Sequence, residues 1–563
     1  MHGCASGRKV CADGLHGFRY VKIYLDALET DFPDAEPYGF VSVNVVYLNF
    51  TAYLGTPDTF TGWFECSDTT LNQLWYDAAY TNEMCIDTFR VNDTEPRGAA
   101  SPSLIGKLVI HDAPKRDRDP YVGDIAVAGR TLYLTHNVSI AARNVLADLA
   151  DHQRSDGWIP PASLGNYGLA LFDYPLWWVV TSCDLLFYTE DDEYLADYYP
   201  AMLKVLDEYY PSATDNTTGL VSKGLGGSGG YGDYAFLPRT GIITYYNALY
   251  VLALTNAANI AHFYNKSTDA ERWNERASLV SAAINEHLWD TTVGAYVDSI
   301  NSTTHGQDGN MLSVLAGIAP RTRTRSLLSH WSSLALPYGN PFFSNDDLAV
   351  GFSTRVYPFI SYFEIAARFE SSGMEDSAVE EIKRLYGWMA SQDPGTTFWE
   401  GIGAQGGKYE GGYTSAAHGW STGVLPILSN YILGVIPAAP GFRHWILKPV
   451  PAGGLDWARG QVPTPKGPFK VNWALQGISA VFQMNIEVPG GTEGEVAVPV
   501  GLEYAEVIVN DVVIWRGGKG LLLHAQYDDG YVKFGLNGGK YRITVTQGVS
   551  FWYKLRSSKL SLL

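Results

Sequence analysis

The sequence predicts a mainly α-helical protein with β-rich segments at both ends. Between about Ser67 and Leu433, apolar residues recur with the period of amphipathic helices, and short polar breaks separate these segments. Residues 1–60 and the residues after Gly434 instead alternate between apolar and polar side chains, with Gly and Pro between the runs. Long helices that follow one another in pairs predict either an open superhelix or a closed helical ring.

Twelve segments show the helical period, and several open with Ser, Asp or Thr, as helix N-caps do. They cover residues 68–89, 122–136, 139–153, 173–189, 192–210, 242–264, 268–288, 308–318, 321–333, 354–371, 374–391 and 414–433. Successive helix pairs share no visible sequence identity, which disfavours a regular solenoid. Long linkers lie at 90–121, 154–172, 211–241, 289–307, 334–353 and 392–413. Loops of that length within a compact domain are usually functional.

The β-rich ends predict two further units. Residues 1–60 hold too few strands to bury a sheet face, so they are interpreted as the remnant of a larger N-terminal β-domain. After the helices, seven strands predict a β-sandwich, at Trp445–Val450, Phe469–Leu475, Ile478–Glu487, Glu495–Val500, Glu506–Val509, Tyr531–Leu536 and Tyr541–Thr546. The predicted units are therefore 1–60, a helical unit 61–436, a C-terminal β-sandwich 437–548 and a tail 549–563.

Composition narrows the class of partner. The chain has 40 Lys and Arg against 59 Asp and Glu, a net charge of −19, which argues against nucleic acid as a partner. No apolar stretch is long enough to span a bilayer, so no membrane partner is expected. The 16 Trp, 36 Tyr and 23 Phe could supply flat rings that stack on sugars, although most such rings lie in protein cores. A carbohydrate partner fits this composition best.

The cysteines and asparagines bear on cofactors and location. The five cysteines, at 4, 11, 66, 85 and 183, have no zinc-ligand spacing, and neither a metal nor another cofactor is expected. Cys66 and Cys85 are candidates for a disulfide. Six N-x-[ST] acceptor sites favour a secreted glycoprotein, at Asn49, Asn92, Asn137, Asn216, Asn265 and Asn301. The N-terminus lacks the apolar region of a signal peptide, so the expectation is a secreted protein whose recorded N-terminus is incomplete.

The most informative segment is residues 111–124, HDAPKRDRDPYVGD, which lies just before an apolar helix. It holds four aspartates and three cations, stiffened by two prolines, and Asp124 is placed to cap the helix. A solvated, salt-bridged loop is one interpretation. The other is a site in which cations keep some carboxylates ionised while a neighbour in an apolar setting keeps its proton. Glycoside hydrolysis needs that division of roles.

Two further candidates lie near the end of the helical region. Glu400 is a lone carboxylate in Thr396-Thr397-Phe398-Trp399-Glu400-Gly401, where rings could face a sugar and glycine allows close approach of the backbone. An exposed turn acid is the alternative. His418 lies near a predicted helix start, where a lone histidine is more often structural than functional.

These residues resemble the α-L-rhamnosidases of glycoside hydrolase family 78. The family signature runs roughly D-C-P-x-R-(D)-E-R-x-x-W-x-G-D, and residues 112–124 match it if the bracketed position is absent. Phe64-Glu65-Cys66-Ser67-Asp68 resembles the entry to the family's first ring helix, and Trp399-Glu400 resembles its W-E loop. Gly17-Phe18-Arg19-Tyr20 is similar to the end of the preceding β-sandwich.

The resemblance implies an (α/α)6 toroid followed by a C-terminal β-sandwich, and hydrolysis with inversion at the anomeric carbon. By position, Asp117 would be the general acid and Glu400 the base that activates water. Asp112 and Asp124 would bind rhamnose hydroxyls. Further substrate-binding candidates are Arg116, Tyr121, Trp158, Asp173, Trp177, Trp178, Trp399 and His418.

The sequence also departs from the family pattern. Asp117 replaces the usual Glu and is one methylene shorter, Ala113 replaces Cys, and Tyr121 replaces Trp. Two alternatives therefore accompany α-L-rhamnosidase activity. One is another reaction on the same toroid, by a different exo-glycosidase or a polysaccharide lyase. The other is a sugar-binding relative without catalysis.

Overall fold

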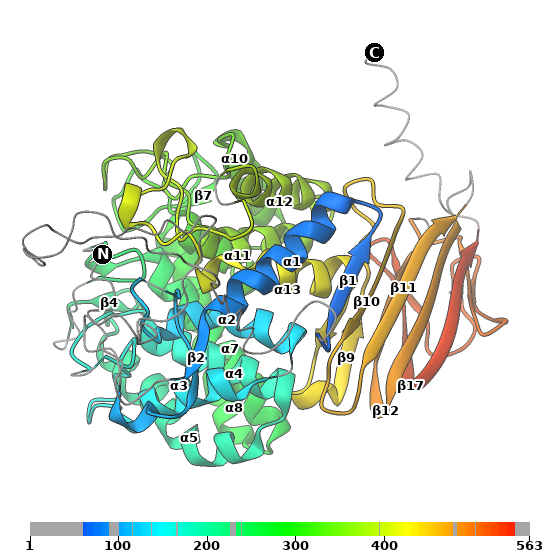
Figure 1. Cartoon of the computed structure of the whole chain (residues 1–563), viewed down its shortest axis with the longest axis horizontal. Helices are drawn as coiled ribbons and strands as arrows, with labels where there is room; N and C mark the ends of the chain where they lie inside the picture. Colours follow the sequence, from blue (N-terminus) through cyan, green and yellow to red (C-terminus); the bar gives the residue numbers. More distant parts are fainter. Residues whose placement is uncertain are drawn as a thin grey trace, which may run out of the picture.

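The computed structural model describes residues 60–88, 101–114, 116–136, 138–164, 167–225, 232–237, 239–392, 395–476, 481–501 and 503–546. Figure 1 shows a helical domain with a β-domain packed against one side of it. Except for Phe60, the predicted N-terminal remnant lies outside the described residues, as do the tail, Cys4, Cys11, Asn49, Asn92 and Asn137.

An inner ring of helices forms the centre of the helical domain. Each packs against the next, and the last packs against the first, so the ring is closed. Its members are α2 (Val122–Thr135), α4 (Tyr174–Thr189), α7 (Thr244–Phe263), α9 (Gln307–Leu315), α11 (Pro358–Phe369) and α13 (Val424–Ile427). Nearly every residue of α2 and α4, and every residue of α11, is buried. An all-round apolar helix needs this central position. The predicted toroid is confirmed.

An outer ring alternates with the inner one along the chain. It consists of α1 (Thr69–Met84), α3 (Ile140–Asp151), α5 (Asp192–Lys204), α8 (Ser267–His287), α10 (Arg321–Ser333) and α12 (Glu375–Ala390). These helices bury one face only; in α8 the buried residues are Ala270, Trp273, Ala277, Val280 and Ile284. Because outer and inner helices alternate, all inner helices run in one direction. None of the described helices combines the length and apolarity needed to cross a membrane.

The predicted helix 414–433 is shorter than expected. A single 3-10 turn, Gly419–Ser421, precedes α13, which continues as a π-helical turn over Leu428–Ile432. Gly423 separates the two, and a Cβ there would lie 2.7 Å from the Tyr362 ring. Residues 414–418 are thereby left as a loop that carries His418.

The C-terminal domain is a β-domain built mainly of antiparallel strands. One continuous path of paired strands runs β1-β10-β11-β12-β17-β13-β14-β15, and β8, β9 and β16 pair alongside it. The strands after the helices are β8 (Val435–Pro437), β9 (His444–Leu447), β10 (Trp457–Val462), β11 (Phe469–Gln476), β12 (Val481–Pro499), β13 (Glu506–Val509), β14 (Val512–Arg516), β15 (Lys519–Gly520), β16 (Gln526–Asp528) and β17 (Tyr531–Thr546).

The strand boundaries differ from those predicted. Two predicted pairs are fused into the long strands β12 and β17, although each contains a glycine pair that signals a turn. The ladder between them accommodates these glycines by a shift in register between Val488 and Glu493. The strands β8, β10, β14, β15 and β16 were not predicted. β10 contains Gly460, which interrupts the sequence pattern of a strand. A glycine is needed there because a Cβ would lie 2.5 Å from the Trp63 carbonyl oxygen.

A strand that precedes the helices belongs to the C-terminal sheet. β1 (Trp63–Cys66) pairs with β10 in antiparallel register, Glu65 opposite Arg459. The first residues of the predicted unit 61–436 thus join the β-domain, and Figure 1 shows β1 beside β10.

The proposed Cys66–Cys85 disulfide is wrong. Both thiols are free and buried, as is that of Cys183. Cys66 ends β1 and Cys85 follows α1, whose 16 residues separate them by about 24 Å. That distance is far beyond the reach of a disulfide.

Candidate active site

The linkers that precede the inner helices meet at one end of the ring. Backbone bridges join neighbouring linkers, as at Tyr121–Ala162, Leu171–Gly232, Gly306–Phe343 and Val356–Ile402. The convergence follows from the parallel inner helices, because all their N-termini lie at the same end. Each candidate site residue comes from one of these linkers or from the first residues of the helix that follows.

Asp112 organises the loop that carries the proposed acid. Its two carboxyl oxygens accept the backbone N–H groups of Asp117, at 3.0 Å, and Asp119, at 2.9 Å. The side chain is almost fully buried, and burial together with the carboxylates of Asp124 and Asp117 raises the pKa of Asp112 to about 7, against an opposing effect of His418. Asp112, predicted to bind sugar hydroxyls, here binds its own loop.

Arg116 joins the two carboxylates that were predicted to be catalytic. Its guanidinium lies 2.9 Å from Glu400 Oε2 through Nη2, and 3.4 Å from Asp117 Oδ1 through Nη1. The side chains of Arg116, Asp117 and Glu400 are 34%, 23% and 14% exposed, so this cluster is open to solvent at the end of the ring. Residues that are nearly 300 positions apart are thereby brought to one cation.

The carboxylate of Glu400 is fixed by further donors. The Tyr409 hydroxyl donates to Oε1 at 2.8 Å, and the backbone N–H of Ser415 donates to Oε2 at 2.9 Å. The indole N–H of Trp420 donates to the Glu400 carbonyl oxygen at 2.9 Å. Burial and the Glu400 carboxylate raise the pKa of Tyr409, which keeps its hydroxyl a neutral donor. The orientation of Glu400 is therefore set by the protein before any ligand binds.

His418 and Asp124 form a buried ion pair behind these residues. Asp124 Oδ1 lies 2.9 Å from His418 Nε2, and both side chains are 4% exposed. Burial opposes a charge on His418, but the carboxylates of Asp124, Glu400 and Asp112 outweigh it and raise its pKa to about 9. The prediction that Asp124 caps α2 is wrong: Asp124 lies in the first turn of the helix, and Tyr121 occupies the cap position. Its carboxylate serves the histidine instead.

The predicted aromatic residues divide into two groups. Trp399 adjoins Glu400, and its buried indole N–H has no hydrogen-bond partner in the described part of the chain. Tyr121 is buried with its ring centroid 6.1 Å from that of Tyr174. By contrast, Trp158 and Trp178 donate their indole N–H groups to backbone carbonyls and are buried in the core.

Asp173 and Trp177 are more deeply buried than Glu400. The Tyr245 hydroxyl donates to Asp173 at 2.7 Å and accepts from the Trp177 indole at 2.8 Å. Both predicted residues have no exposed surface. Burial, followed by the nearby carboxylate of Asp233, raises the pKa of Asp173 to about 7. The structure gives these residues core positions.

Sequence reasoning missed a second charged cluster, centred on Arg239. Its guanidinium lies 2.7–2.8 Å from the carboxylates of Asp233, Asp298 and Asp308, all of them buried. The tyrosine hydroxyl of Tyr246 also donates to Asp233. These residues come from three separate stretches, so no local motif marks them; the only sequence signal is the abundance of Asp in the long linkers.

Trp420 was also missed as a site residue. Its ring stacks on Phe359 with centroids 5.2 Å apart and lies 4.6 Å from the His418 ring. Trp420 also donates a hydrogen bond to the Glu400 carbonyl oxygen, so it links the loop that carries Glu400 to His418. The sequence signal that could have identified Trp420 is its position two residues after His418.

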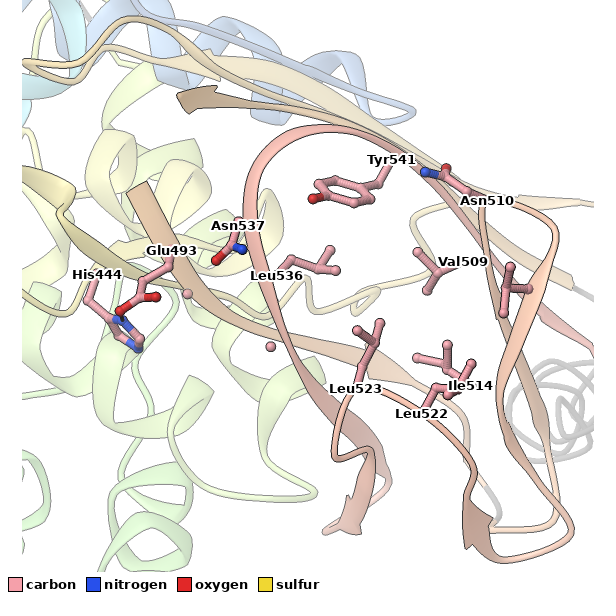
Figure 2. Close-up of a pocket in the computed structure, with 13 residues that line it drawn as sticks. His444, Glu493, Val509, Asn510, Ile514, Leu522, Leu523, Leu536, Asn537 and Tyr541 are labelled. Atoms are coloured by element: carbon pink, nitrogen blue, oxygen red, sulfur yellow. Dashed lines mark ion pairs between the residues drawn. The ribbon is translucent and has the colours of Figure 1, made fainter. Parts of the chain in front are cut away.

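A separate hollow of about 580 Å³ lies in the β-domain, where Figure 2 shows leucine, valine and isoleucine side chains around it. Its acid–base pair is His444 and Glu493, 3.9 Å apart and both well exposed, so neither group is held away from water. We therefore place the candidate active site at Arg116 rather than in this hollow. Within the described residues, no three His, Cys, Asp or Glu side chains are grouped to hold a metal ion.

Comparison with known protein families gives two matches along the chain. Residues 107–331 match the bacterial alpha-L-rhamnosidase 6 hairpin glycosidase domain, and residues 434–512 match the bacterial alpha-L-rhamnosidase C-terminal domain. The first match includes the Arg116 loop and Arg239.

Individual relatives agree with these matches. The chain is 23% identical over 441 residues to an alpha-L-rhamnosidase of Alteromonas sp. (strain LOR), covering 72% of this chain and 44% of that protein. The alpha-L-rhamnosidase of Dictyoglumus thermophilum superposes with a TM-score of 0.65 at 18% identity, over 87% of this chain and 50% of that one. The Streptomyces avermitilis alpha-L-rhamnosidase complexed with L-rhamnose gives 0.63 at 21% identity, over 86% and 42%. These structures share the fold, and this chain spans about half the length of each relative.

Proposed function

Because the chain belongs to the bacterial α-L-rhamnosidase family of six-hairpin glycosidases, we propose that it removes terminal α-L-rhamnose from glycans or glycosides with inversion. The observation that carries the proposal is the placement of Asp117 and Glu400 on the two terminal nitrogens of one guanidinium. Inverting enzymes need two carboxyls that face one bond from opposite sides and leave room for water between them. Their contacts with one cation bring both carboxyls to the same point at the end of the ring, as this mechanism requires.

In this mechanism Asp117 protonates the glycosidic oxygen as the bond to the anomeric carbon breaks. Glu400 accepts a proton from the water that attacks that carbon from the opposite face, and the configuration inverts. The donors from Tyr409 and Ser415 support the role of Glu400 because they aim a carboxylate, which can only accept, at a fixed point. Asp112 supports the role of Asp117 because its carboxylate accepts the Asp117 backbone N–H and so fixes the loop that carries this side chain.

The test is hydrolysis of p-nitrophenyl α-L-rhamnoside by the purified chain, followed by proton NMR of the released sugar. We expect free L-rhamnose whose first-formed anomer is β. Release of the α anomer first would contradict inversion. Binding without turnover would indicate a non-catalytic relative, and preference for another p-nitrophenyl glycoside would indicate a different exo-glycosidase. A lyase would leave the rhamnoside intact and release an unsaturated product from a uronate polymer, which is assayed in parallel.

We also propose that the protein acts outside the cell as a glycoprotein. The acceptor residues Asn216, Asn265 and Asn301 are all exposed, as glycan attachment requires. Expression through a eukaryotic secretory pathway, with an added signal peptide, should give a protein whose mass falls on N-glycosidase treatment. An unchanged mass would contradict glycosylation at these sites.

A further inference from the structure

One face of the β-domain carries rows of polar side chains that cross several strands. The register places Glu65, Arg459, Asn472, Asn485 and Arg542 opposite one another on β1, β10, β11, β12 and β17. Two residues along each strand, a second row contains Trp63, Gln461, Lys470, Glu487 and Lys540. Because side chains alternate between the faces of a sheet, both rows lie on the same face. We call these ten residues the polar face; its strands β10, β11 and β12 lie side by side in Figure 1.

The polar face is exposed and slightly hollow. Arg459 and Lys540 side chains are 52% and 77% exposed, and Asn472, Asn485 and Arg542 are exposed as well. Most of the polar face lines a shallow hollow of about 630 Å³. From Arg459 to Arg542 the first row crosses three gaps between strands, or about 14 Å. This length accommodates a short stretch of a polymer rather than one small molecule.

The charge of the polar face is opposite to that of the whole chain. It holds four cations and two carboxylates, whereas the chain carries a net charge of −19. Glu65 is paired with Arg459, and Glu487 is shared between Lys470 and Lys540. Among the described residues, no carboxylate pairs with Arg542. A guanidinium in that state is suited to bind a carboxylate from outside.

The amides point to the kind of polymer. The side chains of Asn472 and Asn485 make no hydrogen bond to another described residue, and they lie between the two arginines of their row. An amide offers both donors and an acceptor, which match the hydroxyls of a sugar. Protein interfaces instead have an apolar or aromatic centre, and the centre of this face is polar. We propose that the polar face binds a carboxylate-bearing polysaccharide, a uronate polymer, away from the active site.

This inference extends the proposed function, but it is tested by binding alone. The full chain is titrated with polygalacturonate, with neutral dextran and with poly-L-glutamate, at low and high salt. We expect binding of polygalacturonate that weakens with salt, and little binding of the other two. Equal binding of poly-L-glutamate would overturn the proposal in favour of an acidic protein partner. Equal, salt-independent binding of dextran would also overturn it, as would no binding of polygalacturonate.

Variants locate the binding. Arg542→Gln should weaken binding of polygalacturonate about 10-fold, the range of one charge-assisted hydrogen bond. The matched control is Arg325→Gln on α10, an exposed arginine with the same change in charge, which should leave binding unaltered. Equal losses in both variants would contradict the assignment. The double variant Asn472→Ala, Asn485→Ala should also weaken binding, and no effect there would contradict recognition of hydroxyls.

A separate readout distinguishes this inference from the proposed function. All these variants should hydrolyse p-nitrophenyl α-L-rhamnoside as the unaltered chain does, because the polar face lies on the other domain. A chain that binds polygalacturonate but hydrolyses no rhamnoside would refute only the proposed function. A chain that hydrolyses the rhamnoside but fails the binding test would refute only this inference.

Discussion

Arg116 and Arg239 both lie among carboxylates at the same end of the helical ring, but Arg116 is 34% exposed and Arg239 only 6%. Arg239 contacts three buried aspartates, whereas Arg116 contacts Asp117 and Glu400, both partly exposed. Burying an arginine is unfavourable unless it is fully paired, so the three partners of Arg239 are a condition of its burial. Arg116 has water available and can lose a partner at little cost in stability.

The difference separates a cluster that can take part in a reaction from one that holds loops in place. Asp233 and Arg239 precede α7, while Asp298 and Asp308 lie before and within α9, so the Arg239 cluster ties two linkers together. Around Arg116 the carboxylates of Asp117 and Glu400 are partly exposed and therefore accessible to a substrate. Variants in the Arg239 cluster should therefore alter stability, and variants around Arg116 should alter the rate of hydrolysis.

The largest expected effect is that of Glu400→Gln. Loss of the base should slow hydrolysis by about 10²–10⁴-fold for every leaving group, because the attacking water needs its base in each case. The melting temperature should change little. Steady-state rates on p-nitrophenyl α-L-rhamnoside and on a rhamnosyl disaccharide measure this; a rate that survives on either substrate would remove Glu400 from the mechanism.

Asp117→Asn should have an effect that depends on the leaving group. A sugar leaving group needs a proton, so the disaccharide should react about 10²–10⁴-fold more slowly. A p-nitrophenolate leaving group needs little protonation and should lose much less. Asp117→Glu, which restores the family's usual residue, should lower activity if the loop held by Asp112 is adapted to the shorter acid. Equal losses on both substrates for Asp117→Asn would disprove the acid role.

Arg239→Gln should alter stability rather than the rate of hydrolysis, the reverse of the two variants above. It leaves Asp233, Asp298 and Asp308 buried without their cation, which should lower the free energy of unfolding by about 3–5 kcal/mol. The matched change Arg116→Gln should lower it by no more than about 1 kcal/mol. Denaturant unfolding compares the two. If Arg116→Gln proved the more destabilising, the distinction drawn between the clusters would be wrong.

The last comparison concerns pH and His418. Because the folded-state pKa of His418 is raised to about 9, its ion pair with Asp124 stabilises the fold fully below about 6.5. That stability is lost as the pH rises from about 6.5 through 9. The variant His418→Gln lacks this ion pair. The difference in melting temperature between the unaltered protein and the variant should therefore shrink as the pH rises from about 6.5 to 9. A difference that stays constant from pH 6 to 10 would show that His418 carries no charge.

Most of the helices could be predicted because they are longer than two turns and keep their period, and their inner and outer positions follow from how much of each helix is apolar. The exception is α13, where only Val424–Ile427 of the predicted 414–433 is α-helical. The strands were harder. Gly490-Gly491 and Gly538-Gly539 resemble turns in sequence, yet tertiary pairing keeps them within β12 and β17. β10 was missed because its glycine accommodates a neighbouring backbone, a requirement that only the assembled sheet reveals.

The candidate site shows a similar division. Asp117 and Glu400 could be selected from a local motif and a resemblance, and the structure brings them to one guanidinium. The role of Asp112 within its loop depends on which atoms its carboxylate meets, and sequence carries no record of that. Trp177 looked like a sugar platform because its type suits one, but its depth in the ring is set by the helices around it.

The pairing of β1 with β10 has a consequence for the order of events during synthesis. The Glu65–Arg459 contact joins residues 394 positions apart, so β10, the strand that pairs with β1 in the described part of the chain, is made only after the whole helical ring has been translated. At 5–20 residues per second that wait is roughly 20–80 s. During that time β1 lacks its contact with β10, which the start of the ring gains only when the C-terminal domain is made. Closure of the molecule is therefore a late step that the C-terminal domain completes.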